Sequence, residues 1–217
     1  MIRAFGLNEF LTIVYATQWT LLLSLIALIG GAIGGMAIAL LRVGTFRAGR
    51  MFASAFIVTF QGTPLLMQLF LVFFGASVLG FNINPWIAAA VGLTLHASAY
   101  LGDIWRGCIA AVPRGQVEAS KALGLTYVQT MAEVVLPQAV RIAIPPTVGF
   151  LVQLIKMTSV TAIIGFIELT RTGQIINNVT FKPFLVFSIV AGIYFILCWP
   201  LSYLSARLEK RLATATR

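Results

Sequence analysis

The chain has 217 residues, of which 59% are hydrophobic and only 10% are charged, and its mean hydropathy is +0.97. Soluble domains typically carry about 25% charged residues, so this composition excludes an ordinary water-soluble protein and indicates that the chain lies in a membrane. The net charge of +9 does not indicate nucleic-acid binding, because the charges stand in short clusters between apolar runs.

Five apolar stretches are long enough to cross a bilayer of about 30 Å as helices that rise about 1.5 Å per residue. Residues 51–102 carry no charge, but this run is too long for one helix and is divided by the turn-rich segment 80–85. Lys156 is the one charge inside the fourth stretch. We predict a single all-α transmembrane domain over residues 1–217, with spans at about 19–41, 51–79, 86–105, 147–167 and 183–206.

The basic residues predict an orientation. Eleven of the 15 fall in three segments: Arg42, Arg47 and Arg50; Arg106, Arg114, Lys121 and Arg141; and Arg207, Lys210, Arg211 and Arg217. The positive-inside rule places these segments in the cytoplasm. With five spans, we expect the N-terminus outside and the C-terminus in the cytoplasm.

Two features of the spans concern helix packing. Small residues recur every four positions from Ala27 to Ala39, which lets another helix approach closely, either within this chain or from a second subunit. Pro64 cannot donate to the carbonyl of Phe60, so it should kink the second span. Such a kink fits two roles equally well: a gate or cavity wall in the membrane, or ordinary packing between helices.

The polar segment 113–137 cannot lie in hydrocarbon. Its first helix is expected to run from Pro113 to the stop signal Gly124, with Ala119 and Ala122 forming a small face that a partner can approach. Three interpretations compete: a solvated loop, a DNA-binding helix-turn-helix, and a docking element for a cytoplasmic protein.

The second helix of this segment begins with a capping box of Thr126 and Gln129. It is expected to end at Leu136-Pro137, because proline cannot continue a helix. A DNA-recognition helix needs several basic or amide residues on one face, whereas residues 126–136 offer only Gln129. DNA binding is therefore disfavoured.

Several stretches, in order, resemble the polar amino-acid uptake permeases, the histidine/glutamine-type membrane subunits of binding-protein-dependent ABC importers. Residues 118–124, followed after nine residues by 134–137, are similar to the "EAA" loop of such subunits. Four further stretches resemble other motifs of these permeases: 62–70 their "RGTPLLVQLF", 93–107 their "LTLNTGAYLAEIFRGG", 136–146 their "LPQALRIALPP" and 155–160 their "LKDTSL".

The resemblance implies a type I ABC importer transmembrane fold of five helices, in the cytoplasmic (inner) membrane of a bacterium. It implies that a cytoplasmic ATPase dimer grips the 113–137 helices of a cytoplasmic coupling loop, 106–141. Glu118 and Lys121 are also placed to pair on the first of these helices. The implied ATPase-coupling residues are Arg114, Gly115, Glu118, Ala119, Lys121, Ala122, Gly124, Leu136 and Pro137.

The resemblance also implies the remaining components. This chain would be a transport subunit and not an enzyme, and it has no phosphate-binding loop motif. ATP and Mg are expected on the partner ATPase, and no cofactor or metal on this chain. The other expected partners are a second membrane subunit, identical or paralogous, an extracytoplasmic solute-binding protein and an amino-acid-like substrate.

A zwitterionic solute needs polar groups at mid-membrane, because desolvating each charge costs several kcal/mol. The expected substrate-path residues are Gln61, His96, Lys156, Met157, Thr158 and Ser159. Lys156 either attracts the substrate carboxylate or pairs with Glu168 or a neighbouring subunit. His96 either contacts substrate or is a hydrogen-bonded packing residue. Gln61, His96 and Met157 stand where arginine, asparagine and aspartate are common in the family.

Other function classes find less support. A standalone channel or secondary transporter is the alternative function, although no internal repeat is evident. A membrane enzyme is disfavoured, because the chain has one histidine, six acidic residues and no nucleophile–base or metal-ligand spacing. Cys108 and Cys198 form no disulfide framework or metal pattern, and Asp103 is expected to pair with Arg106.

Overall fold

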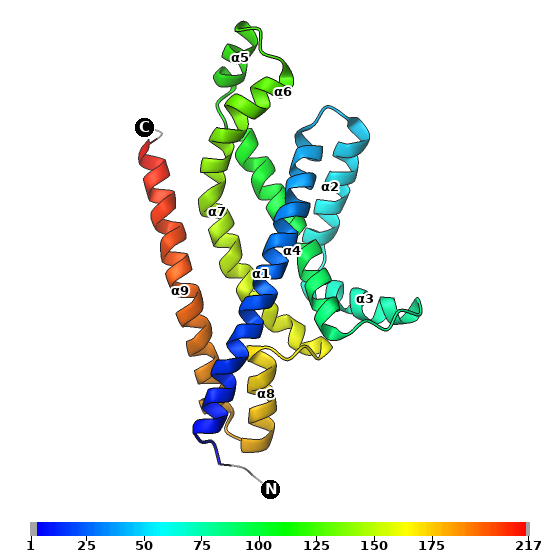
Figure 1. Cartoon of the computed structure of the whole chain (residues 1–217), viewed down its shortest axis with the longest axis vertical. Coiled ribbons are helices and arrows are strands. Elements are labelled where there is room, and N and C mark those ends of the chain that lie inside the picture. Colours follow the sequence, from blue (N-terminus) through cyan, green and yellow to red (C-terminus); the bar gives the residue numbers. More distant parts are fainter. Residues whose placement is uncertain (1–3, 216–217) are drawn as a thin grey trace.

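The computed structural model describes residues 4–215, with side chains through Leu212, and all regular structure in that range is helical. The molecule is an elongated bundle with a hairpin at one end (Figure 1). Its elements are α1 (Leu7–Val43), α2 (Arg47–Gly62), α3 (Leu65–Val78), α4 (Pro85–Ala110), α5 (Arg114–Ala122), α6 (Tyr127–Gln129), the π-helix η1 (Thr130–Val135), α7 (Leu136–Met157), the 3₁₀-helix η2 (Thr158–Ile164), α8 (Leu169–Thr180) and α9 (Pro183–Ala215). We call the end with α5 and α6 the hairpin end; the start of α1 and α8 lie at the opposite end (Figure 1).

Helices α1 and α4 make the most extensive contact in the bundle. Their backbones meet where glycine leaves room: a Cβ atom on Gly35 would lie 2.9 Å from the Cβ of Leu101. In the other direction, a Cβ on Gly102 would lie 2.7 Å from Cγ2 of Ile38. The small residues of the first span therefore pack within this chain, which is one of the two alternatives that the sequence left open.

The apolar core lies where α1, α3, α4 and α7 meet. Its fully buried members include Leu23, Leu69, Leu93 and Leu154. Many other large apolar side chains are exposed along the same helices. This arrangement is typical of a bundle whose outer surface faces lipid.

The second predicted span, 51–79, is broken into two helices. A kink was expected at Pro64, but α2 ends at Gly62, α3 begins at Leu65, and the two helices are bent by 104°. Thr63 and Pro64 are both extended, because a proline disfavours helical geometry in the residue before it. Helix α3 consequently leaves the bundle sideways (Figure 1).

The helix that contains the predicted fourth span begins well before that span. A start at residue 147 was expected, but the helix runs without a break from residue 127 through η1 and α7 to residue 157. The segment between α4 and this long helix is therefore residues 111–126, shorter than the predicted loop 106–141. We call residues 111–129, which add the first turn of the long helix (α6), the hairpin. Helices α1, α4 and α9 also extend beyond the predicted 19–41, 86–105 and 183–206.

The predicted helix end at Leu136-Pro137 is wrong, and η1 supplies the reason. In this π-helical turn the N–H of Leu136 donates to the carbonyl of Met131, five residues back. The wider turn carries the helix past Pro137, which has no N–H to donate. The hairpin is thus continuous with the long helix α7.

Four helices are long and apolar enough to cross a membrane: α1, the continuous helix 127–164, α4 and α9. The broken pair α2 and α3 makes a fifth span if the two are counted together. The predicted all-α membrane fold is confirmed, with four to five spans.

Candidate functional site

The first helix of the hairpin ends as the sequence predicts. Gly124 has a φ of +76°, in the left-handed region that favours glycine. Its N–H donates to the carbonyl of Lys121, and the N–H of Leu125 donates to the carbonyl of Ser120, both at 3.0 Å. These two bonds form a Schellman ending, which reverses the chain sharply after nine helical residues.

The second helix of the hairpin begins with the predicted capping box. Gln129 Oε1 accepts from the N–H of Thr126 at 2.9 Å, and the Thr126 hydroxyl accepts from the N–H of Gln129 at 3.3 Å. Val112, Val135 and Ala139 form a small core below the hairpin. This core fixes the hairpin to the first turns of α7.

The outer face of the hairpin is exposed. The exposed members of the predicted coupling set are Arg114, Gly115, Glu118, Ala119, Lys121, Ala122, Gly124 and Pro137, and only Leu136 is half-buried. Within the described residues Glu118 and Lys121 form no ion pair, so both charges face outward unpaired. Ser120 is buried instead, and its hydroxyl donates to the carbonyl of Gln116 at 2.7 Å.

Leu123 was missed by the sequence analysis. Its side chain is 80% exposed beside Ala119 and Ala122, so the hairpin presents an apolar tip flanked by Glu118 and Lys121. A large apolar residue directly before a stop glycine was the available signal. Exposed apolar residues rimmed by charge mark protein-binding surfaces.

At the opposite end of α7, four predicted path residues lie where α7 passes into η2. Lys156 is exposed, Met157 is half-buried against the main core, and Thr158 is fully buried. The hydroxyls of Thr158 and Ser159 donate back to the carbonyls of residues 155 and 156 at 2.7 Å. Both hydroxyls therefore already hold backbone partners, and Lys156 is the exposed charge of this junction.

Glu168 does not pair with Lys156 among the described residues. It caps α8, accepting hydrogen bonds from the N–H groups of Thr170 and Arg171 at 2.8 Å. The hydroxyl of Tyr194 donates to the same carboxylate at 3.0 Å. Burial raises the pKa of Glu168, and the two backbone hydrogen bonds oppose that rise.

Gln61 and His96 lie in different surroundings. Gln61 is exposed in the last turn of α2, whereas the side chain of His96 is only 2% exposed. His96 Nδ1 lies 2.9 Å from Oε1 of Gln68, and its ring packs on Tyr100 with centroids 4.5 Å apart. His96 therefore has hydrogen-bonding and stacking partners within the chain, and Gln68 is a buried polar residue that the sequence analysis missed.

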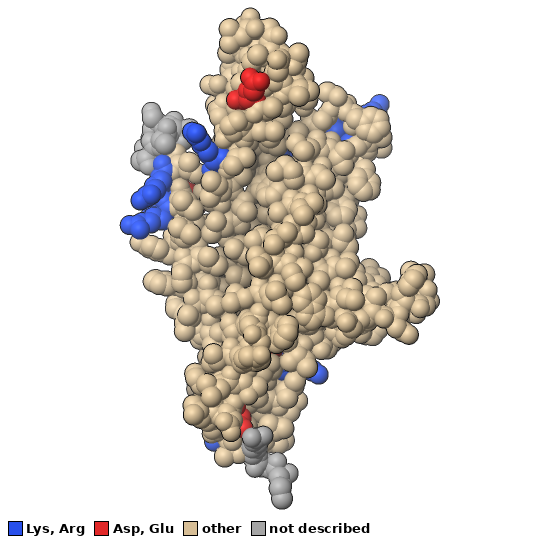
Figure 2. All heavy atoms as spheres, in the orientation of Figure 1, with Lys and Arg blue, Asp and Glu red and all other residues tan. Residues whose placement is uncertain are grey.

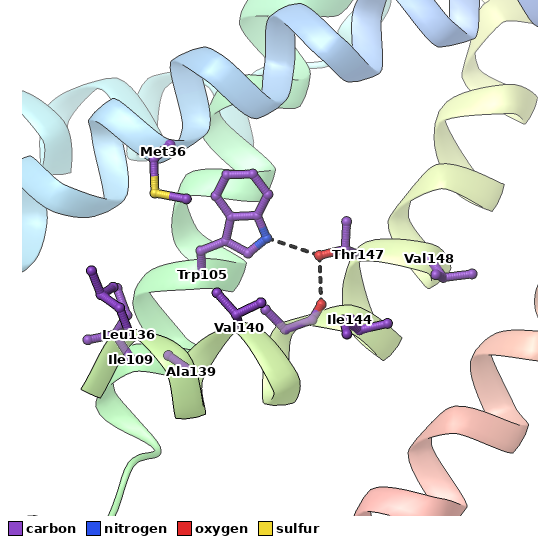
Figure 3. Close-up of a pocket in the computed structure, with 10 residues that line it drawn as sticks. Met36, Trp105, Ile109, Leu136, Ala139, Val140, Ile144, Thr147 and Val148 are labelled. Carbon is purple, nitrogen blue, oxygen red and sulfur yellow. Dashed lines mark hydrogen bonds between the residues drawn. The ribbon is translucent and has the colours of Figure 1, made fainter. Parts of the chain in front are cut away.

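A cavity of about 310 Å³ lies between α1, α4 and α7 (Figure 3). Its lining residues on α7 lie within 136–148, the half of that helix nearer the hairpin. The hydroxyl of Thr147 makes its polar contacts: it accepts from Trp105 Nε1 at 3.0 Å and donates to the carbonyl of Ala143 at 2.6 Å (Figure 3). The remaining lining is apolar, including Met36 and Val140 (Figure 3). Such a cavity suits an apolar group rather than a zwitterion, so it is distinct from the predicted path.

Asp103 and Arg106 form the predicted pair, with a carboxylate oxygen 2.9 Å from the guanidinium. The pair lies on α4 near the hairpin end and satisfies both charges locally. Within residues 4–215, no group of three or more His, Cys, Asp or Glu side chains could hold a metal ion.

Comparisons with known proteins agree on one family. Residues 31–214 match the family described as binding-protein-dependent transport system inner membrane component. The chain is 34% identical over 208 residues to the probable amino-acid ABC transporter permease protein YckA of Bacillus subtilis (strain 168), covering 96% of this chain and 92% of that protein. It is 36% identical to the L-cystine transport system permease protein TcyB of the same organism, over 89% of this chain and 83% of that protein. A crystal structure of an amino acid ABC transporter with histidines superposes with a TM-score of 0.87 at 34% identity, covering 92% of this chain and 94% of the other.

Proposed function

Because this chain belongs to the family of binding-protein-dependent transport system inner membrane components, we propose that it is the permease subunit of an ATP-driven importer for a polar amino acid or amino-acid-like solute. It is a multi-pass protein of the inner membrane, and ATP hydrolysis belongs to a separate component. Relatives of similar identity are named for amino acids in general and for L-cystine. The names of these relatives support an amino acid as the class of substrate without singling out one amino acid.

The observation that carries the proposal is the continuity between the hairpin and the membrane helices. A helix of 31 residues runs from Tyr127 to Met157, about 46 Å at 1.5 Å per residue. A partner that displaces the hairpin would move the whole helix, including the junction at Lys156. A rigid-body shift of this kind is an established way to switch between two states of a transporter.

The hairpin is the proposed seat of a cytoplasmic ATPase dimer, which would hold the ATP and Mg. Its exposed apolar tip, formed by Ala119, Ala122 and Leu123, suits a groove in another protein, and the unpaired Glu118 and Lys121 can pair across the interface. No cofactor is proposed for this chain.

The proposed orientation has the N-terminus outside and the C-terminus in the cytoplasm. The hairpin, the turn between α1 and α2, and the end of α9 all lie at the same end of the molecule (Figure 1). Lys and Arg gather near these elements, and the middle of the visible face carries no charge (Figure 2). This distribution supports a cytoplasmic hairpin by the positive-inside rule. Arg3 and Arg217 lie outside the described residues.

A second membrane subunit, identical or paralogous, and an extracytoplasmic binding protein complete the proposed complex. Helix α3 projects sideways from the bundle (Figure 1), and its side chains Met67, Leu71 and Val78 are at least half exposed. These exposed apolar side chains support the proposal of a second subunit, which would cover them. An extended apolar helix of this kind can pack against another protein within the membrane.

For the substrate path, we propose that Lys156 attracts the carboxylate of the solute. An exposed ammonium at the end of a membrane helix, without an ion pair among the described residues, supports this role over a structural pair with Glu168. Gln61, His96, Met157, Thr158 and Ser159 remain proposed members of the path. Of these, His96 and Thr158 are buried and would be reached only after a change in conformation.

The test uses the complete complex in liposomes, with its ATPase and binding protein. Lys156→Met should lower both solute uptake and solute-stimulated ATP hydrolysis, because it removes the charge and keeps much of the side-chain length. Lys182→Met is the matched control, since it removes an exposed charge from the loop between α8 and α9. Wild-type uptake and stimulation in Lys156→Met would overturn this role. Uptake without any ATPase would instead favour a channel or secondary transporter.

A further inference from the structure

At the break between α2 and α3, the carbonyl of Phe60 lacks its helical donor. The carbonyl of Phe60 would normally accept from the residue four positions later, but that residue is Pro64, which has no N–H. Gln68 supplies the missing donor from the first turns of α3. Its Nε2 lies 2.7 Å from the carbonyl of Phe60, 3.0 Å from the carbonyl of Thr63 and 2.9 Å from the Thr63 hydroxyl. One side chain thus ties the end of α2 to the start of α3.

The contacts of Gln68 fix the orientation of its amide, which in turn fixes the tautomer of His96 on α4. Two of the three groups facing Gln68 Nε2 are carbonyls, so this atom is the amide nitrogen and the oxygen Oε1 points to His96. The oxygen can only accept, so Nδ1 of His96 carries the hydrogen. Nε2 of His96 is then a bare acceptor, and it is buried with no hydrogen-bond partner among the described residues.

The same histidine is in contact with α7 through two aromatic rings. Its ring packs on Tyr100 of α4 at 4.5 Å, and Tyr100 stacks on Phe150 of α7 with centroids 5.7 Å apart and an interplanar angle of 16°. Helix α7 is continuous with the hairpin. A run of direct contacts therefore connects the hairpin helix with the break at Pro64.

We propose that Gln68 and His96 form a latch that sets the angle between α2 and α3 and couples it to movement of α7. Both side chains are positioning residues: Gln68 is 6% exposed and His96 is 2% exposed, so neither faces the surroundings. When α7 shifts, Tyr100 and His96 shift with it, and the hydrogen bond to Gln68 transmits the shift to the break. The role of the latch in transport rests on the proposed function, whereas its role in fixing the angle does not.

The angle can be measured directly by pulsed electron paramagnetic resonance. Spin labels at Val58 on α2 and Val78 at the far end of α3 are suitable, because these side chains are 67% and 86% exposed. The buried Cys108 and Cys198 are replaced by alanine to leave only the labelled sites. Helix α3 has 14 residues and is about 21 Å long, so a swing of about 20° would move its far end by about 7 Å.

Two crossed substitutions separate the hydrogen bond from the packing of the ring. His96→Phe keeps a ring against Tyr100 but loses the donor to Gln68. His96→Asn loses the ring but places an amide N–H near the position of Nδ1. The measurement is made on the full complex in lipid nanodiscs. If Gln68 and His96 act as proposed, the distribution of Val58–Val78 distances should broaden in His96→Phe and should match the wild type in His96→Asn.

Gln68→Met is the second test, because it keeps the length of the side chain and removes all of its hydrogen bonds. It should broaden the same distribution and abolish solute-stimulated ATP hydrolysis. Ser77→Ala is the matched control, since it removes a hydroxyl bond to the carbonyl of Phe73 that lies wholly within α3. This control should match the wild type in both measurements.

Wild-type distances in both Gln68→Met and His96→Phe would overturn the latch. So would broadening in His96→Asn alone, which would assign the role to ring packing. A wild-type complex that shows no ATP-dependent uptake would defeat the proposed function, and the distance distributions would still decide whether the latch fixes the angle.

Discussion

Substitution of Gly124 tests whether the sharp ending of α5 is needed for coupling. A side chain added at Gly124 meets no atom within 4 Å, so steric contact with the rest of the chain is not the issue. The strain comes from the backbone alone, at a φ of +76°. A non-glycine residue in the left-handed region costs roughly 1–2 kcal/mol, and a β-branched residue such as valine is less tolerant than asparagine.

This free-energy cost is large for a short hairpin. A penalty of 1–2 kcal/mol lowers the population of the correct ending by a factor of roughly 5–30. We therefore expect a graded loss of solute-stimulated ATP hydrolysis, with Gly124→Asn affected least, Gly124→Ala more and Gly124→Val most. The protein should still insert in the membrane, because Gly124 lies outside the long helices.

The assay compares these variants in liposomes with the ATPase and binding protein present. Gly107→Ala is the matched control: it also adds a methyl group where no atom lies within 4 Å, but at a glycine of α4 without positive φ and outside the predicted coupling set. It should couple normally and stabilise α4 by up to about 1 kcal/mol. Full transport by Gly124→Val, or equal losses in Gly107→Ala and Gly124→Ala, would refute the reasoning.

Three further predictions concern other parts of the chain. Leu123→Asp should leave folding nearly unchanged, because the side chain is 80% exposed, yet weaken ATPase binding about tenfold or more by losing roughly 1.5–3 kcal/mol of apolar burial; an unchanged Kd would contradict this. Thr147→Val should destabilise the bundle by about 1–3 kcal/mol in thermal unfolding, because Trp105 Nε1 loses its acceptor, whereas Thr147→Ser should not; equal Tm values for the two variants would argue against that bond. Burial raises the pKa of Glu168 above its ordinary 4.5, so its contribution to stability is present below pH 4.5 and is lost as the pH rises through the folded-state pKa. Wild type should therefore lose more thermal stability than Glu168→Gln as the pH rises above 4.5, and parallel pH profiles would show that this carboxyl does not control the effect.

Local signals in the sequence were sufficient for the hairpin. Gly124 as a stop and Thr126 with Gln129 as a start act through bonds between residues at most five apart, so their geometry does not depend on the rest of the fold. The pair of Asp103 and Arg106 belongs to the same class.

Proline positions were harder to interpret, because the outcome depends on neighbours. At Pro64 the helix breaks, and Gln68 from the next helix supplies the missing hydrogen bond. At Pro137 the helix continues, because a π-helical turn accommodates the residue. Single-sequence rules state that proline disturbs a helix, but tertiary contacts and turn geometry decide between a break and a continuation.

Long-range contacts were also beyond the sequence. The hydrogen bond between His96 and Gln68 joins residues 28 apart, and that between Trp105 and Thr147 joins residues 42 apart. A polar residue inside an apolar run signals that a partner exists, but it does not name the partner. Gln68, one turn after a proline, was such a signal.

Reconstituted transport tests the central claim most directly. Purified permease is placed in liposomes with and without its ATPase, and uptake of labelled polar amino acids is followed with the binding protein outside and ATP inside. The account predicts uptake only when both the ATPase and hydrolysable ATP are present, and its loss when the hairpin carries Gly124→Val. Equal uptake by liposomes that lack the ATPase would contradict it.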